Sequence, residues 1–234
     1  WLMRQAGRYL PEYQRVRERF TFLDMCRNSE AAAEVTVASA RRIGADAAIV
    51  FADILLPLVP MGASLFFEAG EGPRIERPVR DAAAIAALRP VDARESLGFV
   101  GESVRLCVAE LGSTLPVIGF AGAPFTLASY AVEGGSSRNF VETKTLMYRE
   151  PAAWDDLMRR ISDVTIDYLA LQVDAGAAVV QLFDSWVGAL SPADYRRFAL
   201  PHVRRIVDAI RPRVPVIYFG TGTAGLLPLL RETH

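Results

Sequence analysis

Segments with a helical hydrophobic period alternate along this chain with short, almost continuous apolar runs. Helices are expected over residues 30–43, 95–111, 154–175 and 191–210. In the third of these, apolar side chains recur at spacings of three and four, which places them on one helical face. Ser191 and Pro192 form an N-cap and first-turn pair that opens the fourth helix, and Pro201 is expected to kink it.

Buried strands are expected in the apolar runs between these helices. The runs lie at 46–53, 116–122, 178–185 and 214–220. Strands that are apolar along their whole length and alternate with helices indicate a parallel sheet covered by helices, and therefore an α/β fold. A doubly wound sheet and a (β/α)8 TIM-type barrel both satisfy this pattern. The similar lengths of successive units favour the barrel.

In either architecture the carboxyl ends of the strands meet at one edge, where active sites form. Asp53, Asp184 and Ser185 lie at such ends. Asp53 and Asp184 each follow an apolar run, so each carboxylate needs a partner that offsets its lost hydration. A role facing a ligand and a structural role, as an N-cap or in an internal ion pair, are both open for these two residues.

The first residues contain two arginines, Arg4 and Arg8, on either side of Gln-Ala-Gly. Gly7 is unfavourable inside a helix, so the segment is expected to be a loop or the edge of one. Guanidinium groups bind carboxylates and phosphates in a bidentate manner, which makes an anion-binding loop one interpretation. Two solvated surface arginines are the alternative, although the neighbouring Trp-Leu-Met favours a segment that packs against the core.

Composition narrows the function classes. The chain has 234 residues, of which 51% are hydrophobic, and 27 acidic against 26 basic residues give a net charge of −1. This composition excludes a disordered chain and gives no general attraction to nucleic acid or to an anionic membrane. No apolar run approaches the roughly 20 residues of a membrane-spanning helix. The length allows one large domain or two small ones.

Metal and nucleotide motifs are weak in this sequence. Cys26 and Cys107 are far apart and belong to no Cys/His cluster, so free thiols in a reducing cytoplasm are expected, with one long-range disulfide as the alternative. Residues 220–225 match the dinucleotide pattern GxGxxG, but they come late in the chain, and a glycine-rich turn is the favoured interpretation. His202 is interpreted as a structural residue.

Four segments together resemble the uroporphyrinogen decarboxylase family. Residues 1–9, Trp-Leu-Met-Arg-Gln-Ala-Gly-Arg-Tyr, are similar to the family's N-terminal signature, and residues 119–130 are similar to its second signature. Residues 49–55 and 181–185 are similar to two further family segments. The resemblance covers the whole chain in the family's order.

The resemblance implies a single (β/α)8 barrel domain over residues 1–234, in a cytoplasmic homodimer that needs no metal or organic cofactor. The implied reaction, in porphyrin and haem biosynthesis, converts the four acetate side chains of uroporphyrinogen III to methyl groups and gives coproporphyrinogen III. A barrel usually needs about 250 residues, and the family's late Gly-His-Gly segment with its histidine is absent. We therefore expect an incomplete barrel that lacks its last strands and is cut at both ends from a longer enzyme.

The resemblance also assigns roles to particular residues. Asp53 matches an essential aspartate that hydrogen-bonds the pyrrole N–H groups, and Tyr130 and Ser185 match substrate contacts near an acetate. Arg17 matches a further arginine of the cleft. The family's substrate-binding segment is matched by Arg4, Gln5, Ala6, Gly7 and Arg8.

The chemistry fits these residue types. A protonated pyrrole can accept the electron pair that departing CO₂ leaves behind, and a fixed carboxylate at Asp53 would stabilise that cation more than the neutral ground state. The proton donor is open between Tyr130 and an arginine such as Arg4. Two other functions are open as alternatives: a barrel methyltransferase that works with corrinoid partners, and a non-catalytic tetrapyrrole-binding protein.

Overall fold

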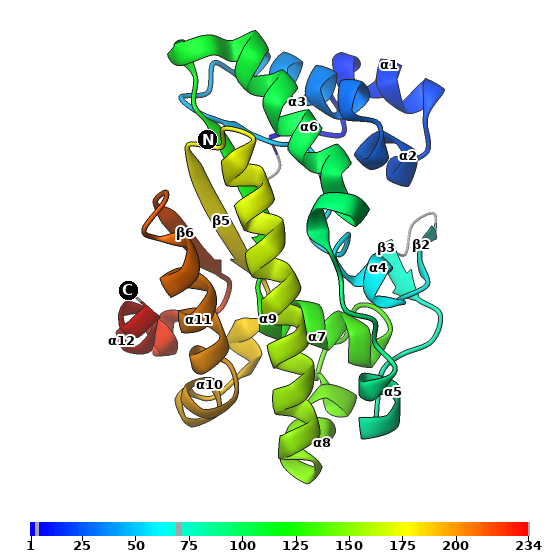
Figure 1. Cartoon of the computed structure of the whole chain (residues 1–234), viewed down its shortest axis with the longest axis vertical. Coiled ribbons are helices and arrows are strands. Elements are labelled where there is room, and N and C mark those ends of the chain that lie inside the picture. The colour runs from blue at the N-terminus through cyan, green and yellow to red at the C-terminus, as the bar shows by residue number, and fades with distance from the viewer. Residues whose placement is uncertain (3–4, 69–71, 234) are drawn as a thin grey trace.

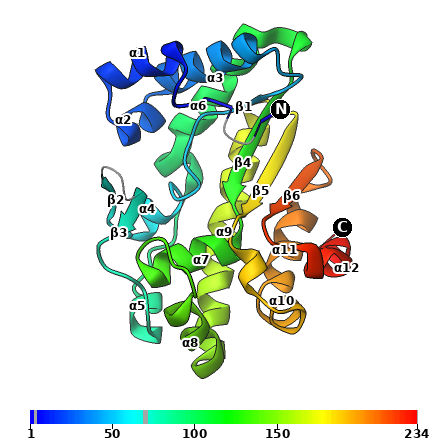
Figure 2. The same ribbon diagram turned by 180° about the vertical axis from the view of Figure 1, so that it is seen from behind.

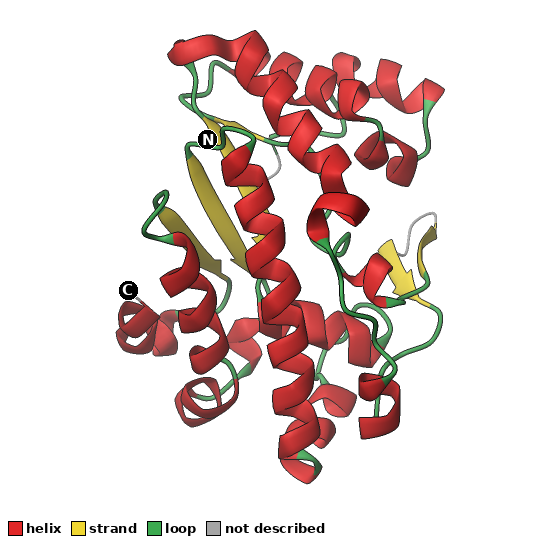
Figure 3. Cartoon of the chain, viewed as in Figure 1, coloured by secondary structure: helices red, strands yellow, loops and turns green. Residues whose placement is uncertain are grey.

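A four-stranded parallel sheet forms the centre of the molecule in the computed structural model (Figures 1 and 3), which describes residues 1–2, 5–68 and 72–233. Its strands lie in the order β1 (Ala48–Ile49), β4 (Val117–Gly122), β5 (Val179–Asp184) and β6 (Val216–Gly220). A separate antiparallel hairpin consists of β2 (Leu65–Glu68) and β3 (Gly72–Ile75).

Helices make up most of the rest of the chain. They are α1 (Pro11–Arg19), α2 (Phe22–Arg27), α3 (Ser29–Ile43), α4 (Leu58–Met61), α5 (Ala82–Ala86), α6 (Ala93–Leu111), α7 (Pro124–Glu133), α8 (Val141–Arg149), α9 (Pro151–Asp174), α10 (Pro192–Phe198), α11 (Leu200–Ile210) and α12 (Leu227–Leu230). Short 3-10 helices lie at Gly112–Thr114, Val187–Ala189, Ala224–Leu226 and Arg231–Thr233. Among the described helices, none has both the length and the apolar character needed to cross a membrane.

The strand order distinguishes the two architectures that the sequence left open. Each parallel strand lies beside the next parallel strand in the chain, whereas a doubly wound sheet reverses its order at a switch point. Helices α9 and α11 lie on the same face of the sheet, and Figure 2 shows the strands in front of them when the molecule is seen from behind. The predicted α/β fold is confirmed. Within the described residues β1 and β6 are the edges of the sheet, which does not close into a complete barrel.

Helix α9 forms as its hydrophobic period predicts. It begins with Pro151 in its first turn and ends before Gly176, whose φ of +105° lies in the left-handed region. The predicted face is buried against β4, β5, α6 and α11, and consists of Leu157, Ile161, Val164, Tyr168 and Leu171. This packing holds β4 and β5 in place, and their carboxyl ends are therefore fixed in position.

The helix expected to kink at Pro201 is instead divided into α10 and α11. The division falls at Ala199, so Pro201 occupies the first turn of α11, where its missing N–H is not needed. Ser191 caps α10 as predicted, because its hydroxyl accepts a hydrogen bond from the N–H of Asp194. The expected kink is therefore a break between two helices.

The first strand is much shorter than the run 46–53 suggested. Only Ala48 and Ile49 pair as strand residues with β4, and the last ladder bond joins the N–H of Val50 to the carbonyl of Ile118. The next N–H, that of Phe51, donates to the Thr36 hydroxyl at 2.8 Å. The chain thus leaves the sheet before Asp53, and the ends of β1 and β4 diverge.

Gln172 of α9 satisfies the backbone that this divergence leaves without a strand. The N–H of Phe120 donates to Gln172 Oε1 at 2.8 Å, and Gln172 Nε2 donates to the Phe120 carbonyl at 2.9 Å. Gly119 leaves room for this approach, because a Cβ there would lie 2.7 Å from Gln172 Oε1. Both backbone groups are buried, so without Gln172 they would lack partners.

The first prediction concerns stability. Gln172→Leu should lower the free energy of unfolding by about 3 kcal/mol, because it leaves two buried backbone groups without hydrogen bonds. Urea denaturation measures the change. Gln181→Leu is the matched control, since Gln181 is also fully buried and its amide has no hydrogen-bond partner in the described part of the chain. An equal loss of stability in both variants would contradict the role given to Gln172.

Candidate active site

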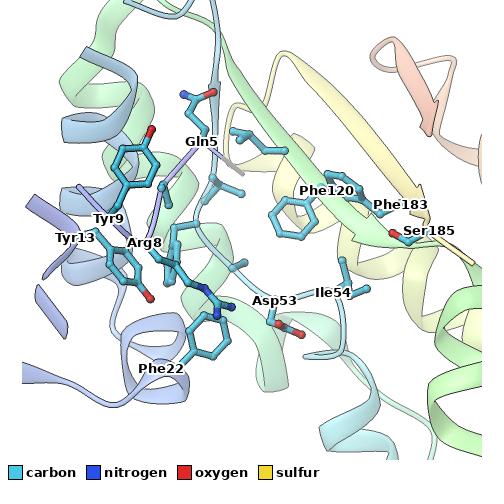
Figure 4. Close-up of a pocket in the computed structure, with 16 residues that line it drawn as sticks. Gln5, Arg8, Tyr9, Tyr13, Phe22, Asp53, Ile54, Phe120, Phe183 and Ser185 are labelled. Carbon is cyan, nitrogen blue, oxygen red and sulfur yellow. The ribbon is translucent and has the colours of Figure 1, made fainter. Parts of the chain in front are cut away.

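A cavity of about 500 Å³ lies where the carboxyl ends of β1, β4 and β5 face the N-terminal loop and helices α1 and α2 (Figure 4). This volume is in the range of small-molecule sites. The residues that line the cavity are Gln5, Ala6, Gly7, Arg8, Tyr9, Tyr13, Phe22, Ile49, Val50, Phe51, Ala52, Asp53, Ile54, Phe120, Phe183 and Ser185. Six predicted site residues are therefore brought together here: Gln5, Ala6, Gly7, Arg8, Asp53 and Ser185.

The N-terminal segment is a loop, as Gly7 predicted, and it is fastened to the core. Gln5 is buried, and its Nε2 donates to the carbonyl of Ala47 at 3.2 Å, just before β1. The Ser39 hydroxyl lies 3.4 Å from the carbonyl of Ala6. Gly7 has a φ of +47°, a conformation that disfavours other residues. These contacts hold the loop against one wall of the cavity.

Arg8 extends from this loop toward the carboxyl end of β1, as Figure 4 shows. Its guanidinium carbon lies 5.9 Å from the centre of the Phe22 ring, within the range of a cation–π contact. Its backbone carbonyl accepts a hydrogen bond from the amide of Gln14. The charged group is exposed at the cavity and close enough to Asp53 to favour the ionised form of that carboxyl. Arg8 is thus a cation available to an acidic ligand.

Asp53 lies half-buried where the chain leaves the sheet. Its Oδ1 accepts the N–H of Leu55 at 2.8 Å. Burial raises the pKa of Asp53 to about 6, although the Leu55 hydrogen bond and the charge of Arg8 act in the opposite direction. A carboxylate in this position has lost water without gaining full compensation. It is suited to accept hydrogen bonds from a ligand or to face a developing positive charge.

Aromatic side chains form the apolar walls of the cavity. Phe51 contacts the rings of Tyr13 and Phe22, with centroids 6.0 and 5.8 Å away. On the sheet side the rings of Phe120 and Phe183 are 5.3 Å apart. These wall residues were not predicted from the sequence, although a period of two from Ser185 back to Phe183 places both side chains on the same side at the end of β5.

Asp184 and Ser185 point to opposite faces of their strand end. Ser185 lines the cavity, whereas the Asp184 carboxylate is fully buried behind the sheet. Asp184 accepts hydrogen bonds from the hydroxyls of Thr126 at 2.7 Å and Tyr218 at 2.6 Å. Burial raises the pKa of Asp184 to about 6, although the hydrogen bonds from Tyr218 and Thr126 act to lower it. Of the two roles left open for Asp184, the structure supports the internal one.

Two predicted site residues, Tyr130 and Arg17, do not line this cavity. The ring of Tyr130 stacks on Trp186, with centroids 3.8 Å apart and an angle of 28° between the planes. The Arg17 guanidinium donates to the carbonyl of Phe20, and Arg17 also lies beside the hydroxyl of Tyr13, a residue of the cavity wall. Arg4 lies outside the described residues.

Two weaker motifs have structural explanations. The glycine-rich segment after β6 is a tight turn against Gly188, where a Cβ would lie 2.2 Å from the carbonyl of Thr221. His202 is buried, with its Nε2 3.2 Å from the Asp155 carboxylate, and burial lowers its pKa. Cys26 and Cys107 are buried free thiols. Within the described ranges, no group of three or more His, Cys, Asp or Glu side chains is arranged to hold a metal ion.

The chain matches a protein-family model described as uroporphyrinogen decarboxylase over residues 1–234. It is 54% identical to a protein of that name from Koribacter versatilis (strain Ellin345), over 100% of this chain and 67% of that protein. It is 53% identical to a namesake from Chloroflexus aurantiacus (strain ATCC 29366 / DSM 635 / J-10-fl), over 99% of this chain and 66% of that protein. The chain spans about two thirds of the length of these curated relatives.

A solved structure also resembles this fold. A methyltransferase from Methanosarcina mazei superposes with a TM-score of 0.76, covering 91% of this chain and 65% of that one. The sequence identity is 17%, so this likeness concerns the fold alone. It agrees with the barrel type that the sequence predicted.

The second prediction concerns the protonation of Asp53. Carbon-13 NMR of the labelled carboxyl should give a pKa of about 6. Arg8→Ala should raise that pKa further, because a nearby positive charge that favours the carboxylate is lost. Arg19→Ala, which removes an exposed arginine paired with Glu34, should leave it unchanged. A pKa near 4 in the unmodified protein would contradict the burial described for Asp53.

Proposed function

Because the chain belongs to the uroporphyrinogen decarboxylase family, we propose that its cavity binds uroporphyrinogen III in the full-length protein and is where the acetate side chains lose CO₂. The product is coproporphyrinogen III, an intermediate of haem and porphyrin biosynthesis. The observation that carries this proposal is the half-buried Asp53 carboxyl, which shares one cavity with the exposed guanidinium of Arg8. This pairs an anion for the centre of the substrate with a cation for its acidic edge.

Asp53 acts at the centre of the tetrapyrrole. Its carboxylate is largely ionised at neutral pH and accepts hydrogen bonds from pyrrole N–H groups. Protonation of the pyrrole that carries the acetate makes the ring cationic, and the ring then accepts the electron pair of the breaking C–C bond as CO₂ leaves. The exocyclic carbon then takes up a proton and becomes the methyl group, and the ring releases the proton that it gained in the first step, which restores the neutral pyrrole. Since Asp53 interacts more strongly with the cation than with the neutral ring, it lowers the barrier.

Arg8 acts at the periphery, where the substrate carries carboxylates. Guanidinium groups bind carboxylates in a planar, bidentate geometry. Arg4 and Arg17 are assigned to the same task, and the loop residues Gln5, Ala6 and Gly7 provide the backbone that faces the substrate. The aromatic walls pack against the apolar faces of the pyrroles.

Ser185 and Tyr130 are assigned to the reacting acetate. Ser185 lines the cavity with its hydroxyl, and Tyr130 stacks on the residue that follows Ser185 in the chain. This neighbourhood supports a joint role in orienting the acetate. The proton comes from Tyr130 or from an arginine such as Arg4, and no metal or organic cofactor takes part.

The assembly and location of the protein are also proposals. Residues 1–234 are assigned to a single barrel domain of a homodimer, on the resemblance to the family. The buried free thiols Cys26 and Cys107 are typical of a reducing compartment and support a cytoplasmic location.

The third prediction tests the role of Asp53 in the full-length enzyme. Asp53→Asn should lower the rate of decarboxylation by about 10²-fold, because a preorganised charge that favours the cationic transition state is removed. Chromatography of the pigments formed from uroporphyrinogen measures the rate. Asp46→Asn, at an exposed position before β1, should retain full activity. Near-wild-type turnover in Asp53→Asn would contradict the role of Asp53 in stabilising the transition state.

The fourth prediction concerns substrate binding by Arg8. Arg8→Ala should weaken binding of uroporphyrinogen by about tenfold or more, since a charge-assisted hydrogen bond contributes about 1.5–3 kcal/mol. Fluorescence titration with the oxidised pigment as a ligand, or KM, reports the change. Arg15→Ala provides the control on the exposed side of α1. Unchanged affinity in Arg8→Ala would show that the cavity cation does not bind the substrate.

A further inference from the structure

A buried hydrogen-bond network lies behind the end of β5 and is separate from the cavity. At its centre is the fully buried carboxylate of Asp184. Its Oδ1 accepts the hydroxyl of Thr126 at 2.7 Å, and its Oδ2 accepts the hydroxyl of Tyr218 at 2.6 Å. The hydroxyl of Tyr195 donates in turn to that of Tyr218 at 3.3 Å. Thr126 and Tyr218 donate directly to the carboxylate, which therefore links β5 to α7 and to β6, and Tyr195 extends the network to α10.

The network also completes the start of helix α7. The N-cap residue of this helix is Ala123, which has no side chain that can accept a hydrogen bond, and its first turn contains no acidic residue. Asp184 supplies a carboxylate at this end from the neighbouring strand, through Thr126 of the first turn. A negative charge is favourable there because the helix dipole and the free N–H groups are positive. The end of β5 therefore determines where α7 begins.

Thr126 connects this anchor to Tyr130. Its hydroxyl donates to Asp184 and accepts the backbone N–H of Trp186 at 3.2 Å. The indole of Trp186 stacks on the ring of Tyr130 at 3.8 Å. Tyr130 lies four residues after Thr126 in α7, so both side chains are on the same side of the helix. One hydroxyl thus ties the start of α7 to the segment on which Tyr130 stacks.

We propose that Asp184 and Thr126 are positioning residues that hold Tyr130 and Ser185 in place for decarboxylation. This inference rests on the proposed function, because it concerns how two of its assigned residues are held. Neither Asp184 nor Thr126 lines the cavity, so neither touches the substrate. They act through the start of α7 and through the backbone of Trp186, which follows Ser185.

The geometry makes a specific demand on residue 126. Its side chain must donate one hydrogen bond and accept another at the same oxygen, in a fully buried position. Serine meets this demand, whereas valine has the shape of threonine but no hydroxyl. Comparing the two substitutions therefore separates the hydrogen bonds from the packing.

The fifth prediction is made for the full-length enzyme. Thr126→Val should lower kcat about tenfold, as expected for the loss of one hydrogen bond to a charged group, and should change KM less than twofold because the arginines that bind the substrate are untouched. Thr126→Ser should restore most of kcat. Thr165→Val is the matched control, because Thr165 is a fully buried threonine on α9 whose hydroxyl has no hydrogen-bond partner in the described residues. It should retain the wild-type kcat.

A double-mutant cycle tests the route through Tyr130. If Thr126 acts by holding Tyr130, the Thr126→Val loss should largely disappear in a Tyr130→Phe background. Asp184→Asn serves in the same cycle if Thr126→Val does not fold. Additive effects of Thr126→Val and Tyr130→Phe on kcat would overturn the positioning role. An unchanged kcat in Thr126→Val, with an active wild type, would overturn it as well. Either result would leave the proposed function intact. A wild-type enzyme that does not convert uroporphyrinogen would overturn the proposed function itself.

Discussion

The burial of the Asp53 carboxyl is the constraint on which the candidate site depends. A carboxyl whose pKa is raised in the folded state opposes folding once the pH exceeds its unfolded pKa, because the folded chain then holds a poorly solvated charge. At neutral pH Asp53 therefore costs stability that the core must supply. The same incomplete solvation leaves the carboxylate free to interact with a ligand, since Leu55 contributes a single backbone N–H and Arg8 acts from the opposite wall.

The position of Asp53 follows from how β1 ends. A longer first strand would keep this segment paired with β4, and no cavity could form between them. The divergence requires other partners for the freed backbone groups, and Gln172 and Thr36 provide them from α9 and α3. The absence of a side chain at Gly119 lets Gln172 reach the strand. Residues distant in sequence and outside the cavity thus determine its shape.

The sequence predicted what depends on local pattern. The hydrophobic face of α9, the Ser191 cap and the loop at Gly7 follow from periodicity, capping chemistry and backbone conformation, and the structure contains each of them. The end of β1 at Ile49 could not be predicted from the sequence, because the competing hydrogen bond from Gln172 arises only when α9 packs on the sheet. The β2–β3 hairpin was missed because its strands are short. That Ser185 lines the cavity and that Asp184 enters a buried network on the other side became clear only from their contacts in the structure.

We propose that one cavity, with Asp53 on one wall and Arg8 on the other, receives the tetrapyrrole in the full-length protein. A crystal structure of the full-length protein with bound coproporphyrinogen tests it most directly. We expect the pyrrole N–H groups to lie within hydrogen-bond distance of the Asp53 carboxylate, and a carboxylate of the ligand to lie on the guanidinium of Arg8. A tetrapyrrole bound elsewhere, with no contact to Asp53 or Arg8, would contradict the role proposed for this cavity.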